Sequence, residues 1–217
     1  MSIINEITVK IVENAKDGES IRSLASKTGF AYSAVYRWIS ELEKYGAICL
    51  IRKGNRDIIK IYKNMIYNKF KELGDAVSVI EKDNCFWELA KTLKLKIRFV
   101  RGTAATIWTK GSFITGDFYE RIYFLEVEKK DADSLKRILK KEGIAYTEGK
   151  MNNKRPLIWI IQREGFESER KDSLPIMPLK ELIRWAEKLH LENVLEQLDR
   201  LYHLRLSVKY SEVLTNA

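Results

Sequence analysis

The chain has 217 residues, a formal net charge of +9 at pH 7 and a 45% hydrophobic composition. This length is enough for two modest domains, and a pI near 9.4 suits a nucleic-acid partner. No apolar run approaches the ~20 residues of a membrane helix, and the first residues lack the apolar core of a signal peptide. We therefore expect a cytoplasmic protein without membrane contact. Cys49 and Cys85 are far apart and form no CxxC motif, which argues against a disulfide framework or a thiol-rich metal site.

Two helices are predicted at the start of the chain. The first falls within residues 3–16, where apolar residues repeat at helical spacing; these are Ile4, Ile7, Ile11 and Ala15. The second begins after Ser20, whose hydroxyl can accept a hydrogen bond from a free N–H of the first turn. It ends at Gly29, because glycine adopts the left-handed cap conformation without a Cβ penalty.

A third helix, predicted from Ala31 to Tyr45, has two different faces. Its apolar face should pack on the preceding helix and comprises Val35, Trp38, Ile39, Leu42 and Tyr45. The opposite face carries hydrogen-bonding and stacking groups with one cation: Tyr32, Ser33, Tyr36, Arg37 and Ser40. A helix of this kind fits the DNA major groove with its N-terminal half against base edges.

A basic β-hairpin is predicted next. Residues 48–51 and 58–62 are rich in β-branched side chains, and Gly54 and Asn55 between them favour a turn. The tip would present Arg52, Lys53 and Arg56 to phosphates. Residues 20–63 contain nine Lys or Arg and three Asp or Glu, a net of +6 in about a fifth of the chain. The positive charge is therefore concentrated in this segment.

This segment resembles the winged helix-turn-helix regulators of archaea and bacteria. The resemblance covers about the first 65 residues and is carried by Leu24-Ala25, Thr28-Gly29-Phe30, Ser33 to Arg37, Leu42 to Ile48 and the Gly54-Asn55 turn. It implies a domain over residues 1–63 that binds double-stranded DNA, although a winged helix can also contact protein or RNA. The implied DNA-binding residues are Tyr32, Ser33, Tyr36, Arg37, Ser40, Arg52, Lys53, Asn55 and Arg56.

Residues 64–94 are predicted to connect two domains. Apolar residues there are spaced by four, three, four and three positions: Ile66, Phe70, Leu73, Val77 and Ile80. This stripe predicts either a dimerisation helix or an amphipathic helix packed on its own domain, and Gly74 interrupts it. Asp83 and Asn84 indicate a boundary before a second helix over residues 86–93. A homodimer would suit a protein that reads paired half-sites.

Residues 95–206 predict a small mixed α/β domain that ends in a helical hairpin, which makes the chain α+β overall. Strands are expected at 96–100, 119–127, 144–147 and 156–161. Helices are expected after Asp131 or Asp133 up to Gly143, at 179–189 and from 191 onward, while 103–109 is ambiguous and 165–173 is a charged loop. Residues 207–217 are predicted to be a frayed tail.

The second domain also faintly resembles nucleotidyltransferases and abortive-infection antitoxins, through Arg101 to Ala105 and the order of its elements. Nucleotidyl transfer needs paired carboxylates for Mg²⁺. Glu126 and Glu128 have the one-residue spacing, although alternate acids on a strand are more often a solvated edge, whereas Asp117 and Glu120 are spaced by three. The departure from the motif argues against an active enzyme and against a metal or cofactor.

No other catalytic motif is found in the sequence. The leading hypothesis for the chain is therefore a DNA-binding transcriptional regulator. The chain has no HExxH, GxSxG or Walker-type sequence, and its two histidines, His190 and His203, both fall in the terminal helices. Its tryptophans can fill the core or line a ligand pocket: Trp87, Trp108, Trp159 and Trp185. The second domain would then bind a small-molecule effector or a protein partner, or build the dimer. The alternative is an antitoxin-like module that represses its own operon.

Overall fold

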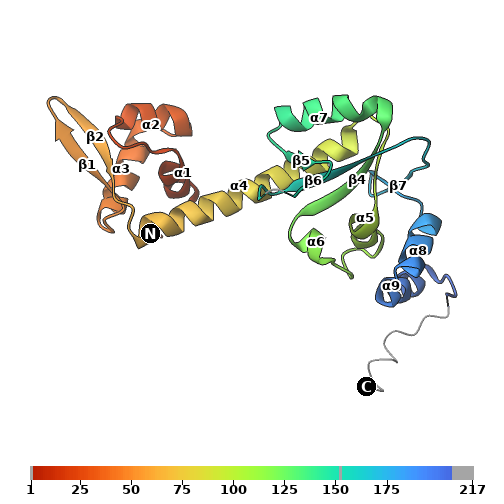
Figure 1. Cartoon of the computed structure of the whole chain (residues 1–217). Coiled ribbons are helices and arrows are strands. Elements are labelled where there is room, and N and C mark those ends of the chain that lie inside the picture. Colours follow the sequence, from red (N-terminus) through yellow and green to blue (C-terminus); the bar gives the residue numbers. More distant parts are fainter. Residues whose placement is uncertain (1, 152, 207–217) are drawn as a thin grey trace, which may run out of the picture. The chain divides into compact units, whose positions relative to one another are not determined.

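The computed structural model describes residues 2–151 and 153–206, apart from the side chain of Tyr119. The chain divides into two compact units, the first ending at Ile80 and the second beginning at Glu81. The α+β class and the terminal helical hairpin are as predicted (Figure 1). The predicted tail, residues 207–217, lies outside the described residues.

The first unit consists of three helices followed by a two-stranded hairpin and the start of a long helix. Its elements are α1 (Glu6–Asn14), α2 (Ile21–Thr28), α3 (Tyr32–Glu43), β1 (Ile48–Lys53), β2 (Arg56–Ile61) and the part of α4 (Met65–Thr92) up to Ile80. Asn5 caps α1 in a capping box with Thr8. The predicted helix therefore begins later than residue 3, and Ile4, which we expected in the apolar stripe, is 63% exposed.

A single core holds the three helices and the hairpin together. Ile11, Leu24, Ile39 and Ile59 come from α1, α2, α3 and β2 and are fully buried. Each contributes roughly 1.5–3 kcal/mol by leaving water. Tyr45, which we placed on the apolar face of the third helix, lies beyond the end of α3 and is 50% exposed.

Helix α4 is one continuous helix, so the predicted break at Asp83 and Asn84 is wrong. The hydroxyl of Tyr123 donates a 2.5 Å hydrogen bond to the carboxylate of Asp83. Asp83, which itself belongs to the second unit, therefore bonds a side chain of the sheet rather than capping a helix. Gly74 does not interrupt α4 either: a Cβ there would lie 2.5 Å from the side chain of Glu13, so glycine lets α1 approach α4 closely.

The second unit is a six-stranded mixed sheet with helices on both faces. Its elements are β3 (Ile97–Phe99), α5 (Arg101–Trp108), α6 (Gly116–Tyr119), β4 (Ile122–Glu128), the short 3-10 helix η1 (Lys129–Asp131), α7 (Ala132–Lys141), β5 (Ala145–Thr147), β6 (Leu157–Arg163), β7 (Glu169–Lys171), β8 (Leu174–Ile176), α8 (Leu179–Lys188) and α9 (Glu192–Tyr202). In Figure 1, α7 lies on one face of the sheet, and α5 and α6 lie on the other.

The strand order is β5-β6-β4-β3-β8-β7. Strand β6, expected at residues 156–161, is parallel to both of its neighbours, β5 and β4. Strands β7 and β8 pair antiparallel, and β8 adds to β3. The prediction of a loop over 165–173 is therefore wrong for Glu169–Lys171, and the ambiguous segment at 103–109 is the helix α5.

Candidate nucleic-acid interface

The turn between α2 and α3 is fixed by local hydrogen bonds. The hydroxyl of Ser20 accepts from the N–H of Ser23 at 3.2 Å, as predicted for a helix cap. Gly29 ends α2 with φ +75°, a conformation that glycine adopts at no steric cost. Ala31 precedes α3 and provides no side-chain cap. The first N–H groups of α3 are therefore available to donate to an anion such as a phosphate.

Helix α3 presents one buried and one exposed face. Val35, Trp38, Ile39 and Leu42 are buried, in agreement with their predicted role. Tyr32 and Tyr36 are 50% and 44% exposed, and their rings stack with centroids 6.3 Å apart. Because the two tyrosines are one turn apart, each ring supports the other and both stay on the outer face.

The polar residues of α3 are not equally accessible. Ser33 and Arg37 are exposed, and the Arg37 guanidinium lies 5.9 Å from the ring centre of Trp38. Ser40 is half-buried, and its hydroxyl donates to the carbonyl of Tyr36 at 3.1 Å. The accessible polar and aromatic groups of α3 are therefore concentrated in the first half of the helix. An approaching base edge would meet Tyr32, Ser33 and Tyr36 there.

The hairpin of β1 and β2 carries an exposed basic tip. Arg52, Lys53, Asn55 and Arg56 are all exposed. In the strand register Lys53 lies directly opposite Arg56, and Arg52 lies opposite Asp57. Like charges placed directly opposite each other destabilise an antiparallel pair. The Lys53–Arg56 pair therefore does not stabilise the hairpin, and both cations can interact with an external anion.

A hollow of about 720 Å³ joins α2, α3 and the hairpin. It is lined by Ser20, Ile21, Arg22, Tyr32, Asn55, Arg56 and Asp57. Three residues that we predicted as DNA-binding thus border one concave surface, together with Arg22, which our prediction left out. Arg22 is the second residue of α2 and is exposed. In the sequence, only its place in the basic segment 20–63 could have indicated that it lies on this surface.

Lys60 lies outside this surface. Its ammonium pairs with Asp17 at 3.0 Å, and the same carboxylate accepts from the N–H of Ile61. The hydrogen bond from Ile61, followed by the one from Lys60, holds the pKa of Asp17 below its ordinary value. This contact ties the turn before α2 to the hairpin, so Lys60 has a structural partner within the unit.

In the second unit, the two acids considered for a metal are both in ion pairs. Glu126 is only 8% exposed and lies 2.6 Å from the guanidinium of Arg98, so it is not the solvated strand edge that we expected. Glu128 lies 2.9 Å from the ammonium of Lys96. Across the described residues, no group of three or more His, Cys, Asp or Glu side chains is arranged to hold a metal ion.

Arg98 is the centre of a buried charge network. Its side chain is fully buried and donates to Glu126 from β4 and to Glu181 from α8. Burial would lower the pKa of Arg98, but the hydrogen bonds to Glu181 and Glu126 outweigh it and hold the pKa above its ordinary value. Arg163 from β6 also lies 3.2 Å from Glu181. The network attaches α8 to three strands of the sheet.

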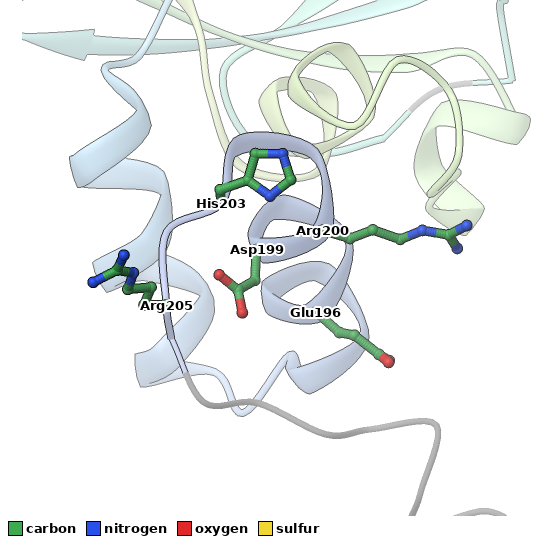
Figure 2. Close-up of a pocket in the computed structure, with 5 residues that line it drawn as sticks. All are labelled: Glu196, Asp199, Arg200, His203 and Arg205. Carbon is green, nitrogen blue, oxygen red and sulfur yellow. The ribbon is translucent and has the colours of Figure 1, made fainter.

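A further hollow lies along α9, as Figure 2 shows, and is lined by Glu196, Asp199, Arg200, His203 and Arg205. The side chains of Glu196 and Arg200 point away from Asp199 and Arg205 in this view. Asp199 accepts from the N–H of Leu206 at 3.2 Å, which fixes the segment after the helix. Because its side chains diverge, this hollow has no convergent set of ligands.

Comparison with known proteins assigns the first unit. Residues 9–56 match the family described as a helix-turn-helix domain, a stretch that contains the whole of α2 and α3. No curated protein and no solved structure gave a match. The N-terminal unit is therefore a helix-turn-helix domain, a class of fold that binds DNA. In the described part of the chain, no helix is both long and apolar enough to span a membrane.

Proposed function

We propose that this protein is a DNA-binding transcriptional regulator of the winged helix-turn-helix type. The observation that carries the proposal is the division of α3 into a buried apolar face and an outer face with Tyr32, Ser33, Tyr36 and Arg37 exposed. At 1.5 Å per residue, the 12 residues of α3 give a rod about 18 Å long. Such a helix enters a major groove about 12 Å wide with its first turns against base edges.

The hairpin takes the role of the wing in this proposal. Arg52, Lys53 and Arg56 contact the phosphate backbone beside the groove that α3 occupies, and Arg22 contacts a phosphate across the hollow. Phosphate contacts set the position of the domain, whereas α3 supplies the contacts that distinguish bases. The opposed like charges of Lys53 and Arg56 support this division, because a phosphate bound between them would offset their repulsion.

We propose that the protein acts as a homodimer through α4. Leu73, Val77 and Ile80 lie on one stripe of α4 and are 37%, 39% and 47% exposed, whereas Phe70 one turn earlier is 5% exposed. The stripe thus begins with a buried side chain in the core of the first unit and continues along α4 with exposed apolar side chains. A second copy of α4 packed along it would bury these side chains and place two copies of α3 for paired half-sites.

The sheet domain would then bind an effector or a protein partner, and we propose that it is not a nucleotidyltransferase. Mg²⁺-dependent transfer requires carboxylates that are free to bind the metal. Glu126 already pairs with Arg98 and Arg163, and Glu128 with Lys96. Binding a cation to either acid would require breaking these pairs, one of which is buried.

A salt series with two DNA duplexes tests the DNA-binding proposal. Full-length protein is titrated by fluorescence anisotropy against DNA from upstream of its own gene and against random DNA of equal length. We expect tighter binding to the upstream duplex that persists at physiological salt. Arg37→Ala should remove the preference, and Arg184→Ala, which changes an exposed arginine on α8, should not. Equal binding to both duplexes that falls steeply with salt would mean that the basic residues supply only backbone affinity.

A further inference from the structure

A separate hollow of about 540 Å³ lies in the second unit and shares no residue with the surface proposed to bind DNA. It is lined by Arg101, Gly102, Thr115, Asp117, Phe124, Trp185, Leu189 and Leu191. These residues come from the start of α5, from α6 and the residue before it, from β4, and from the end of α8 with the turn that follows. Its volume is within the range of small-molecule sites.

One wall of this hollow is apolar and partly aromatic. Phe124 and Trp185 are half-buried, and Leu189 is 50% exposed although it is a large aliphatic residue. Trp159 from β6 packs against Phe124 with ring centroids 5.8 Å apart, which supports the ring from behind. Exposed leucine beside two aromatic rings leaves apolar surface in water, and an apolar group seated there would cover it.

The hollow also carries one positive and one negative side chain. The Arg101 guanidinium lies over the Phe124 ring at 5.4 Å from its centre, and Asp117 is exposed in the first turn of α6. Within residues 2–151 and 153–206, neither side chain belongs to an ion pair, whereas the acids of the neighbouring sheet do. Each charge is therefore free to bind a group of opposite sign.

A close backbone approach brings the two charged residues to the same hollow. A Cβ atom on Gly102 would lie 2.9 Å from the side chain of Thr115, which is closer than carbon atoms pack. Glycine at this position therefore lets the start of α5 touch the residue that caps α6. Arg101 lies immediately before the contact on one segment, and Asp117 lies two residues after it on the other.

From this arrangement we infer that the hollow binds a free α-amino acid with a large apolar side chain. Arg101 takes the carboxylate, since a guanidinium matches a carboxylate with two parallel hydrogen bonds. Asp117 takes the ammonium group, and the side chain lies on Phe124, Trp185 and Leu189. A nucleotide fits less well, because Asp117 would repel a phosphate that only one arginine offsets. The inference names the effector of the proposed regulator, but binding itself does not depend on DNA.

Calorimetry on the full-length protein without DNA tests this inference. L-phenylalanine, L-tryptophan and L-leucine are titrated beside 3-phenylpropionate, which lacks the ammonium group, and phenylalanine amide, which lacks the carboxylate. We expect at least one of the three amino acids to bind, and we expect phenylalanine to bind more tightly than its two truncated analogues. No heat from any of the three amino acids at about 10 mM, the weak end of specific binding, would overturn the inference, and so would analogues that bind as tightly as the amino acid.

Substitutions of Arg101 and Asp117 then test whether the ligand binds in this hollow. Arg101→Gln should weaken binding of the amino acid about tenfold or more, because it removes a charge-assisted hydrogen bond. Asp117→Asn should weaken the amino acid similarly, and it should not weaken any residual binding of 3-phenylpropionate, because that ligand has no ammonium group for Asp117 to bind. Lys110→Gln, at another exposed cation with positive φ, and Glu142→Gln, at an exposed acid of the same unit, are the matched controls. Binding that resists both test variants would put the ligand elsewhere and overturn the assignment. A DNA titration run separately distinguishes a failed effector site from a failed DNA-binding proposal.

Discussion

Replacing Arg56 should change stability and DNA affinity in opposite directions. Arg56 lies directly opposite Lys53 beside the turn of the hairpin, and both side chains are exposed. Arg56→Glu converts a repulsive cross-strand pair into an attractive one, and such pairs are worth roughly 0.2–1 kcal/mol. We expect the first unit to become more stable by about that amount, while binding to DNA weakens.

The neutral variant gives the size of the DNA effect. Each phosphate contact contributes about 0.9 to the slope of log K against log salt for duplex DNA. Arg56→Gln should therefore lower the slope by about 0.9, which corresponds to about fivefold weaker binding at 0.15 M salt. The expected loss should be the same on specific and random duplexes, because a phosphate contact carries no sequence information.

Two assays on the full-length protein separate these effects. Anisotropy titrations over a salt series give the slope, and urea unfolding followed by ¹⁹F NMR of labelled tryptophan gives the stability. Trp38 is the one tryptophan among residues 1–80 and therefore reports the first unit. Lys60→Gln is the control cation, since Lys60 already pairs with Asp17. If Arg56→Glu destabilises the unit, or if Arg56→Gln leaves the slope unchanged, our account of the hairpin is wrong.

Three further predictions concern other parts of the chain. Arg37→Ala should cost ~1–3 kcal/mol on a specific duplex and little on random DNA, as measured by anisotropy; equal losses on both would make Arg37 a phosphate contact. Val77→Glu should convert a dimer to a monomer in sedimentation velocity, whereas Asn68→Glu on the opposite side of α4 should not; an unchanged mass for Val77→Glu would remove α4 from the dimer. Because the hydrogen bond from Arg98 holds the pKa of Glu181 below its ordinary 4.5, Glu181 favours folding above that pH. This stabilisation should fade as pH falls below about 4.5, and Glu181→Gln should abolish that part of the acid dependence in urea unfolding. An acid dependence that survives the substitution would assign it to other carboxylates.

The helix-turn-helix could be predicted because its signals are local. Ser20 and Gly29 bound α2 through contacts within a few residues, and the faces of α3 follow from helical spacing alone. The hairpin follows from two β-branched runs and one turn. Arg22 was missed because a single exposed arginine on a helix carries no pattern. Its significance comes from the hollow that it shares with Arg56, 34 positions further along the chain.

The sheet domain was harder to predict because its contacts are distant in sequence. Strand β8 is three residues long and contains Pro175, and it is a strand because it pairs with β3. In the sequence, Arg98 cannot be distinguished from any other cation on a strand, because its partners Glu126 and Glu181 are 28 and 83 residues away. The continuity of α4 was missed for the same reason, since Asp83 is held by Tyr123 from β4.

Selection of duplexes from a random pool tests the central claim most directly. Full-length protein is mixed with random DNA at physiological salt, and the retained duplexes are sequenced beside those retained by Arg37→Ala. Our account predicts an enriched motif with two half-sites related by a dyad and spaced by about one helical turn, 10–10.5 base pairs. It also predicts that Arg37→Ala relaxes the preference at one position in each half-site. A pool that shows no enrichment, or a motif unchanged by Arg37→Ala, would contradict base reading by this face of α3.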